Sequence, residues 1–230
     1  MRTKTYYVDK KVIPHQTAVD FQIEERAKII LLKTQKFDTS ESNLLILCEH
    51  YPILTCGSSA KESHLLIDRS ELPNVGLEIS TIKRGGAITF HGPGQIVGYP
   101  ILDLENFKTD IRWYIETLAN VIIDTLGNYN ISGYYDHEFP GVWIYDEVTA
   151  KKKKICAVGV HLSRWVTNHG FALNVNNNMS FYQYFIPCSI DSPDRETTSL
   201  SREIGFDVSI TEVKKIIMKN FQKYFSTELI

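Results

Sequence analysis

The sequence lacks the features that would place it in several specialised classes of protein. Its 230 residues carry 25 basic and 27 acidic side chains, which gives a formal net charge of −2. Without a basic excess, we expect neither a nucleic-acid partner nor binding to an anionic membrane surface. No apolar run approaches the roughly 20 residues that cross a bilayer, so we expect no membrane span.

Cysteine is also scarce. Cys48, Cys56, Cys156 and Cys188 have no CxxC spacing and do not cluster with histidines. This spacing argues against a disulfide framework and against a structural zinc site. The first residues, MRTKTYYVDKKVI, contain neither an apolar stretch nor the cleavage site of a secretory signal. We therefore expect free thiols in a reducing compartment, the cytoplasm, although a processed organellar form would have the same sequence.

The remaining composition is that of an ordinary globular protein, with 43% apolar and 23% charged residues. The pattern predicts a single α+β domain over residues 1–230, in which helices pack on a mixed sheet. Helices are expected over 15–35 and 110–127, and after Ser209, which stands in capping-box spacing with Glu212. A helical turn is expected over 180–185. Strands are expected over 4–13, 43–50, 77–84, 95–104, 131–135, 141–146, 153–162 and 169–175.

Two finer expectations concern the N-terminal part of the chain. In the helix over 15–35, apolar residues recur at three- and four-residue steps and predict an inner stripe of Val19, Ile23, Ala27 and Ile30. The segment over 50–66 is rich in turn-forming residues, and we expect it to be irregular.

The most specific segment is RGGAITFHGPGQ, residues 84–95. Four glycines and one proline exclude a regular helix or strand, and they would allow a ligand to approach the backbone closely. Arg84 and His91 flank this loop. The alternative is a tight glycine-rich hairpin without a ligand. Neither His91 nor His169 has metal-ligand spacing with another histidine, cysteine or carboxylate, so we expect no metal.

Two further residues could carry chemistry. Lys154 ends a run of four lysines, which in isolation indicates a solvated turn, but it also begins an apolar strand that would partly desolvate its amine. Cys188 lies in FIPCSIDS, a turn-like context, whereas Cys48 and Cys156 lie in apolar strands as packing residues; Cys56 is ambiguous. A cysteine and a lysine together fit acyl transfer through a thioester.

The ordered set of motifs resembles the lipoyl(octanoyl) transferase family. It comprises RGGAITFHGPGQ, then KICAVGV, HGFALNVN, IPCSI and TTSL, preceded by EHYPILTCGSSAKESHLL, and it extends from about residue 49 to 201. The resemblance implies the fold of biotin and lipoate protein ligases. It also implies transfer of octanoate from acyl-carrier protein to an enzyme cysteine, and then to a lysine of a lipoyl-accepting domain. No cofactor is implied.

The resemblance assigns roles to individual residues. It implies that Cys188 is the nucleophile and that Lys154 lowers the pKa of this cysteine and moves protons. The substrate-binding stretches that it implies are Arg84, Gly85, Gly86, Ala87, Ile88, Thr89, Phe90 and His91, then Ala157, Val158 and Gly159, and finally Gly170, Phe171 and Ala172. Two positions depart from the family pattern: Ser189 replaces the usual glycine after the cysteine, and Phe90 stands where tyrosine is common.

The resemblance also implies partners. The donor would be octanoyl-acyl-carrier protein, and the acceptors would be the lipoyl domains of 2-oxoacid dehydrogenase E2 subunits and the glycine cleavage H protein. We expect a monomer, with Lys151 to Lys153 as a positive rim for acidic carriers. Two alternatives stay open: an ATP-dependent lipoate or biotin protein ligase, and a non-catalytic binder of acyl-carrier or lipoyl domains.

Overall fold

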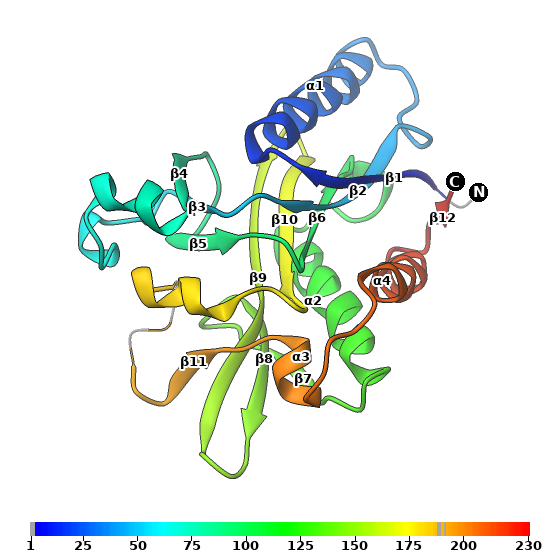
Figure 1. The fold of residues 1–230 in the computed structure, drawn as a ribbon. Coiled ribbons are helices and arrows are strands. Elements are labelled where there is room, and N and C mark those ends of the chain that lie inside the picture. Colours follow the sequence, from blue (N-terminus) through cyan, green and yellow to red (C-terminus); the bar gives the residue numbers. More distant parts are fainter. Residues whose placement is uncertain (1–2, 188–189, 191) are drawn as a thin grey trace.

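A computed structural model describes residues 3–187, 190 and 192–230. Within this part of the chain, a nine-stranded mixed sheet has the order β12-β1-β2-β6-β10-β9-β8-β7, with β11 paired to β9 (Figure 1). β1 runs parallel to β2, whereas β2, β6, β10, β9 and β8 pair antiparallel. The expected mixed sheet is therefore confirmed. Its strands are β1 (Lys4–Ile13), β2 (Asn43–His50), β6 (Gln95–Ile101), β7 (Gly133–Tyr135), β8 (Gly141–Asp146), β9 (Lys151–Ser163), β10 (Val166–Asn174), β11 (Arg195–Thr197) and β12 (Glu228–Leu229).

A second, three-stranded sheet lies beside the first in Figure 1 and carries the glycine-rich segment. The expectation that residues 84–95 contain no regular strand is wrong at Ile88–His91, which pair with Ile53–Cys56 because the glycines lie outside these four residues. It comprises β3 (Ile53–Cys56), β4 (Glu78–Thr81) and β5 (Ile88–His91), in the order β4-β3-β5. The expectation that 50–66 is irregular is wrong at β3, whose four residues are all buried. Because β3 pairs with β4 on one side and β5 on the other, tertiary pairing overrides the turn-forming composition around it.

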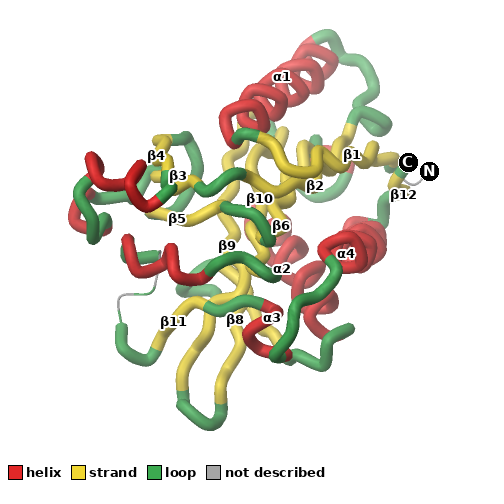
Figure 2. Tube along the Cα trace, in the orientation of Figure 1, coloured by secondary structure: helices red, strands yellow, loops and turns green. Residues whose placement is uncertain are grey.

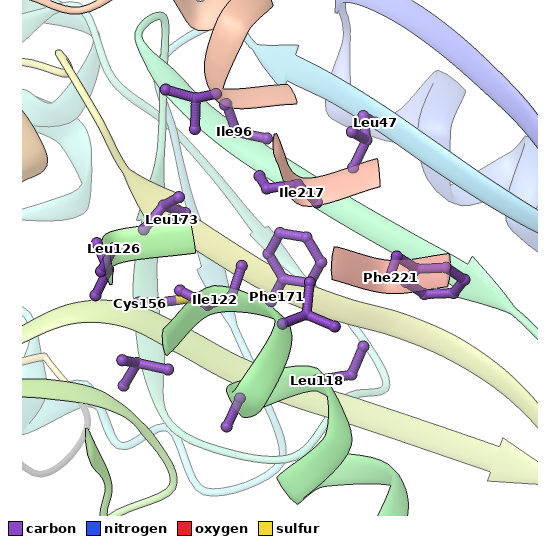
Figure 3. Close-up of a cluster of buried hydrophobic side chains, with 14 of the residues drawn as sticks. Leu47, Ile96, Leu118, Ile122, Leu126, Cys156, Phe171, Leu173, Ile217 and Phe221 are labelled. Carbon is purple, nitrogen blue, oxygen red and sulfur yellow. The ribbon is translucent and has the colours of Figure 1, made fainter. Parts of the chain in front are cut away.

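Helices cover both faces of the main sheet (Figures 1 and 2). α1 (His15–Thr34) packs on one face, and α2 (Ile111–Gly127), α3 (Leu200–Ile204) and α4 (Ile210–Phe225) pack on the other. Figure 3 shows the second of these cores, where Leu118 and Ile122 of α2 and Ile217 and Phe221 of α4 meet side chains of the sheet. Short 3-10 turns are η1 (Glu62–His64), η2 (Arg69–Val75), η3 (Leu104–Asn106) and η4 (Met179–Tyr184); the last of these confirms the expected helical turn.

The sequence located the ends of the helices well, but it gave the wrong inner face for α1. The expected cap of α4 is confirmed, because the Ser209 side chain accepts a hydrogen bond from the Glu212 amide. In α1, however, Ala18, Gln22 and Ile29 are buried, whereas Ile23 is 48% exposed. Apolar residues lie on several sides of this helix, so the three- and four-residue spacing did not select a unique stripe.

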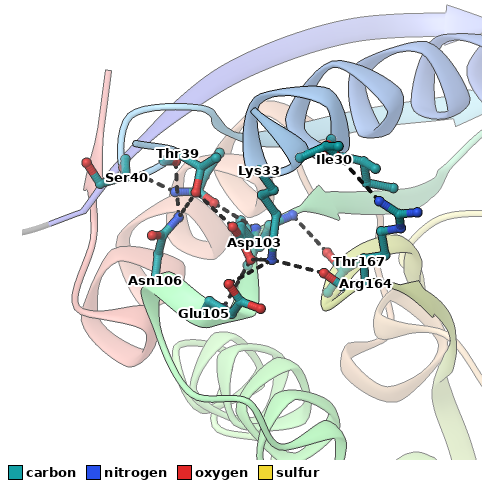
Figure 4. A network of polar contacts seen from close by, with 12 residues as sticks. Ile30, Lys33, Thr39, Ser40, Asp103, Glu105, Asn106, Arg164 and Thr167 are labelled. Carbon is teal, nitrogen blue, oxygen red and sulfur yellow. Dashed lines mark hydrogen bonds and ion pairs between the residues drawn. The ribbon is translucent and has the colours of Figure 1, made fainter. Parts of the chain in front are cut away.

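A polar network fixes the C-terminal end of α1 to the sheet (Figure 4). The Lys33 ammonium lies 2.5 Å from the Asp103 carboxylate and donates to the Arg164 carbonyl at 2.9 Å, while the Thr39 hydroxyl donates to Asp103 at 2.7 Å. Asp103 is buried, and its charge is compensated by these donors. The network therefore anchors α1 across the sheet and, through it, His15 at the other end of the helix. No helix in the described ranges is long and apolar enough to cross a membrane.

Candidate active site

A cavity of about 400 Å³ lies where β6, β9 and β10 meet the glycine-rich loop. This volume lies within the range of small-molecule sites. Its walls bring together the glycine-rich loop and strands β9 and β10, which begin about 60 residues later in the sequence. The family resemblance assigned catalytic or substrate-binding roles to sixteen residues. Thirteen of them line the cavity: Lys154, Arg84, Gly85, Gly86, Ile88, Thr89, His91, Ala157, Val158, Gly159, Gly170, Phe171 and Ala172.

Two of the expected substrate-binding residues do not line the cavity. Ala87 and Phe90 are both buried in the smaller sheet and its surroundings. The Phe90 ring stacks on Phe181, with ring centroids 5.0 Å apart, within an apolar cluster under the loop. Phe90 therefore acts as a packing residue, which explains why a hydroxyl at this position is dispensable for the fold.

The glycine-rich loop is held against β9 by backbone contacts. The Gly85 amide donates to the Val160 carbonyl at 3.4 Å, and a Cβ atom at Gly159 would lie 3.2 Å from the Gly85 carbonyl oxygen. The Arg84 guanidinium donates to the carbonyl and the hydroxyl of Thr55 at 2.7 and 2.9 Å. The absence of a side chain at Gly159 thus allows the loop to form one wall of the cavity.

Lys154, on the same strand β9, is buried in the wall of the cavity. Lys154 is only 6% exposed, and its ammonium lies 5.2 Å from the centroid of the Trp143 ring. The expected desolvation of this lysine is therefore confirmed. The Thr198 amide donates to the Lys154 carbonyl at 2.9 Å, which ties β9 to the TTSL segment.

The other three lysines of the run differ from the expectation of a solvated turn. All four lie in β9, and the turn precedes them. Lys153 lies 2.7 Å from Asp146 and 3.4 Å from Glu203, and Lys151 lies 3.0 Å from Glu196. Lys152 lies 4.0 Å from Asp136. Intramolecular carboxylates thus neutralise much of the positive rim that the sequence suggested for acidic carriers.

Three buried histidine rings cluster beside the cavity, a feature that no sequence spacing indicated. His15 stacks on His91 with centroids 5.6 Å apart, and His50 lies edge-on to both, at 5.2 and 5.7 Å. Burial lowers the pKa of His15 to about 3 and lowers those of His50 and His91. These rings are therefore neutral at physiological pH. Among the described residues, no group of three or more histidine, cysteine or acidic side chains is arranged to hold a metal ion.

A chain of buried amides connects His91 to the strand of Lys154. His91 Nδ1 pairs with Gln95 Oε1 at 2.8 Å, and Gln95 Nε2 donates to Asn174 Oδ1 at 2.9 Å. Asn174 Nδ2 donates to the Thr198 carbonyl at 2.9 Å, and the Tyr182 hydroxyl donates to Asn174 at 3.1 Å. Asn174 and Tyr182 also line the cavity. No sequence motif indicated these two residues, because single amides and phenols occur throughout the chain.

Three of the cysteines have the environment of inert thiols. Cys48, Cys56 and Cys156 are free and buried. Burial raises the pKa of Cys156, which lines the cavity, and that of Cys48 to about 12, so both stay protonated at neutral pH. Cys48 and Cys156 are therefore packing residues, as the sequence indicated. Cys188 and Ser189 lie outside the described residues.

Comparison with known proteins gives a consistent result. Residues 26–222 match the lipoyl protein ligase A/B catalytic domain. The chain is 40% identical to an octanoyltransferase of Cytophaga hutchinsonii over 227 residues, which cover 96% of this chain and 92% of that protein. It is 43% identical to an octanoyltransferase of Flavobacterium psychrophilum over 216 residues, which cover 94% and 89%.

The solved structures that resemble this chain share its fold. The putative lipoate protein ligase Ta0514 of T. acidophilum with bound lipoic acid aligns with a TM-score of 0.72 at 13% identity, covering 100% of this chain and 88% of that one. A biotin protein ligase of Aquifex aeolicus, in complex with biotin and ATP, aligns with a TM-score of 0.53 at 15% identity, covering 97% and 70%. These alignments confirm the ligase-like α+β fold expected from the sequence.

Proposed function

Because the chain belongs to the lipoyl protein ligase A/B catalytic domain family, and its relatives at 40% and 43% identity are octanoyltransferases, we propose that it is an octanoyltransferase of lipoate biosynthesis. It would transfer octanoate from octanoyl-acyl-carrier protein to a lysine of a lipoyl-accepting domain. The observation that carries this proposal is Lys154, buried in the wall of a cavity that the glycine-rich loop also lines.

The proposed reaction has two steps. The Cys188 thiolate attacks the donor's thioester carbonyl, a new carbon–sulfur bond forms, and the carrier's thiol leaves with a proton. The acceptor's lysine amine then attacks the enzyme thioester, an amide forms, and the Cys188 sulfur leaves. Lys154 is the group that supplies and removes these protons. Its ammonium would stabilise the Cys188 thiolate and give a proton to the carrier's thiolate as the donor's carbon–sulfur bond breaks. The resulting amine would then accept the proton that the acceptor's amine loses as the amide forms.

The placement of neighbouring residues supports this pairing. Pro187, which is covalently bonded to Cys188, lines the same cavity as Lys154 and pairs with Ile88 of the glycine-rich loop region. The buried thiol of Cys156 is a poor competitor for the role of nucleophile, because burial raises its pKa to about 12. Apolar side chains such as Val97, Val158 and Phe171 line the cavity and suit an uncharged acyl chain, whose burial is worth about 0.8 kcal/mol per methylene.

The proposal also covers the protein partners, the oligomeric state and the cellular compartment. The donor would be octanoyl-acyl-carrier protein, and the acceptors would be the lipoyl domains of 2-oxoacid dehydrogenase E2 subunits and the glycine cleavage H protein. Residues 1–230 would form one catalytic domain that acts as a cytoplasmic monomer without a cofactor. The cavity residues of the glycine-rich loop, β9 and β10 would bind the octanoyl group.

The decisive experiment is intact-mass measurement after incubation with octanoyl-acyl-carrier protein. A single octanoyl adduct on the wild type, absent in Cys188→Ala, is the expected result, followed by loss of the adduct when a lipoyl domain is added. No adduct on the wild type, or an adduct that persists in Cys188→Ala, would refute the thioester. Modification that requires ATP and free octanoate would indicate a ligase instead, and binding without turnover would indicate a non-catalytic binder.

A further inference from the structure

The cavity has a closed end and an open end. Val97 and Tyr99 of β6, His15 of α1 and His91 of β5 line it and are each at most 6% exposed. Other lining residues, such as Gly85 in the loop and Pro140 before β8, are exposed. The exposed lining residues belong to the glycine-rich loop and to the segment before β8, so the side formed by β6 and His15 is the closed one.

His15 is held firmly in this position. It is the first residue of α1 and follows Pro14, whose ring fixes the backbone there. Its ring stacks on His91 and abuts His50, and the opposite end of the helix is anchored by Lys33 and Asp103. His50 is in turn fixed, because its Nε2 pairs with the Tyr99 hydroxyl at 2.8 Å and its Nδ1 with the Ile13 carbonyl at 2.9 Å. The His15 ring is therefore confined by packing against two neighbouring rings, while its Nδ1 is buried without a hydrogen-bond partner among the described residues.

The span of the cavity matches a medium acyl chain. Lys154 lies on β9, and one strand, β10, separates β9 from β6, so the two strands are about 10 Å apart. The strand register places Val97 of β6 level with Ala157, three residues beyond Lys154, so the backbones of Lys154 and Val97 are about 14 Å apart. The Lys154 side chain lines the cavity and extends over part of this distance. An extended eight-carbon chain is on the order of 10 Å long, from carbon–carbon bonds of about 1.5 Å. A chain with its carbonyl near the Lys154 amine would therefore extend its terminal methyl group toward the closed end.

We propose that His15 is a specificity-determining residue, whose ring closes the acyl cavity and sets the longest saturated acyl chain that the enzyme transfers efficiently. This inference rests on the proposed octanoyltransferase function. The size of the side chain at position 15 therefore determines the length of the cavity. Removing the imidazole would deepen the cavity and admit about two further methylenes, whereas a larger ring would shorten it.

The test measures kcat/KM for C6, C8, C10 and C12 acyl-carrier proteins with the wild type, His15→Ala and His15→Trp. In His15→Ala we expect the C10-to-C8 ratio of kcat/KM to rise by about ten-fold, the effect of burying two additional methylenes. In His15→Trp we expect the preference to move toward C6. The matched control is Ile29→Ala, because Ile29 is buried on the same helix but does not line the cavity. It should lower the melting temperature and leave the chain-length profile unchanged.

The outcomes separate the two proposals. Folded His15 variants that keep the wild-type dependence of kcat/KM on chain length would overturn the role of His15. An Ile29→Ala variant whose chain-length dependence shifts as much as that of His15→Ala would overturn it too. If the wild type transfers no acyl group, the proposed function fails, and calorimetric binding of free C8, C10 and C12 fatty acids then tests the wall by itself. In that case His15→Ala should gain affinity for C10 relative to C8, and equal affinities in both proteins would overturn the inference. The same binding measurement on His15→Trp decides the matter if His15→Ala does not fold.

Discussion

Lys154 passes directly beside Gly141: a Cβ atom at position 141 would lie 2.5 Å from Lys154 Cε and 3.3 Å from its Nζ. Gly141 begins β8, and its φ of +152° also lies in a region that side chains rarely adopt. The Trp143 ring, two residues further along β8, lies beside the same ammonium. The start of β8 therefore holds the Lys154 side chain in place.

Gly141→Ala should displace the amine of Lys154. We expect kcat for octanoyl transfer to fall at least ten-fold, because small misplacements of a catalytic group are costly. Gly205→Ala is the control for backbone strain, since Gly205 has a φ of +88° but nothing within 4 Å of its Cβ position. Both variants should lose stability, and only Gly141→Ala should lose much activity. Similar kcat values in the two variants would argue against a positioning role for Gly141.

The lysine run offers a second comparison. Lys154→Ala should lower kcat by 100-fold or more, a typical effect of losing a general acid–base group. Lys153→Ala should lower the melting temperature, because Lys153 pairs with Asp146 and Glu203, but it should change kcat less than three-fold. Lys151→Ala and Lys152→Ala should resemble the wild type in steady-state transfer assays. Equal losses at all four positions would instead mark the run as a docking patch for acidic carriers.

The sequence predicted the order and type of most elements because their signals are local. The apolar run over 43–50 is β2, and Asp110 and Ser209 cap α2 and α4. Local signals failed where long-range contacts decide. β3 exists because β4 and β5 pair with it, and the inner face of α1 depends on which residues the sheet meets.

The distinction between local signals and long-range contacts also applies to the candidate active site. The glycine-rich loop, Lys154 and the β9 and β10 stretches were found because they form an ordered set of motifs, and the fold brings them to one cavity. His15 and His50, by contrast, are 35 residues apart in the numbering and come from a helix and a strand that meet only after folding. The pairing of loop, helix and sheet that creates the histidine cluster has no local sequence signature.

Asn174 provides a test of the buried amide chain. Asn174→Leu keeps the approximate shape but leaves Gln95, Tyr182 and the Thr198 carbonyl without their partner. We expect a loss of about 2–4 kcal/mol in the free energy of unfolding and a fall in kcat, because Thr198 is bonded to the Lys154 backbone. Asn176→Leu is the matched control, since Asn176 bonds both backbone groups of Val208 and does not line the cavity. Asn176→Leu should lower the free energy of unfolding, measured by urea unfolding, without a comparable fall in kcat, measured in transfer assays. A fall in kcat as large as that of Asn174→Leu would argue against a role of the buried amide chain in positioning Lys154.

The buried histidines make stability depend on pH in a definite direction. Burial, together with the nearby His50, His169 and Arg84, lowers the pKa of His15 to about 3, and burial lowers that of His169 to about 4. Unfolded histidines titrate near pH 6.5. As the pH falls through this value, the unfolded state binds protons that the folded state does not, so the free energy of unfolding decreases. The stability contributed by neutral imidazoles is therefore present above about pH 6.5 and is lost progressively below it.

Urea unfolding between pH 7 and 5.5 isolates this effect, because the carboxylates titrate mainly at lower pH. Each buried histidine should contribute a limiting slope of about 1.4 kcal/mol per pH unit. His15→Gln should remove one such contribution and flatten the curve, whereas His137→Gln, at a residue whose side chain is 77% exposed, should leave the slope unchanged. An unaltered slope in His15→Gln would show that His15 takes up protons equally in the folded and unfolded states, so that its pKa is not lowered by folding. A neutral ring is what the closed end of an apolar acyl cavity requires, since a buried imidazolium without a counter-ion would repel Arg84 and oppose the binding of hydrocarbon.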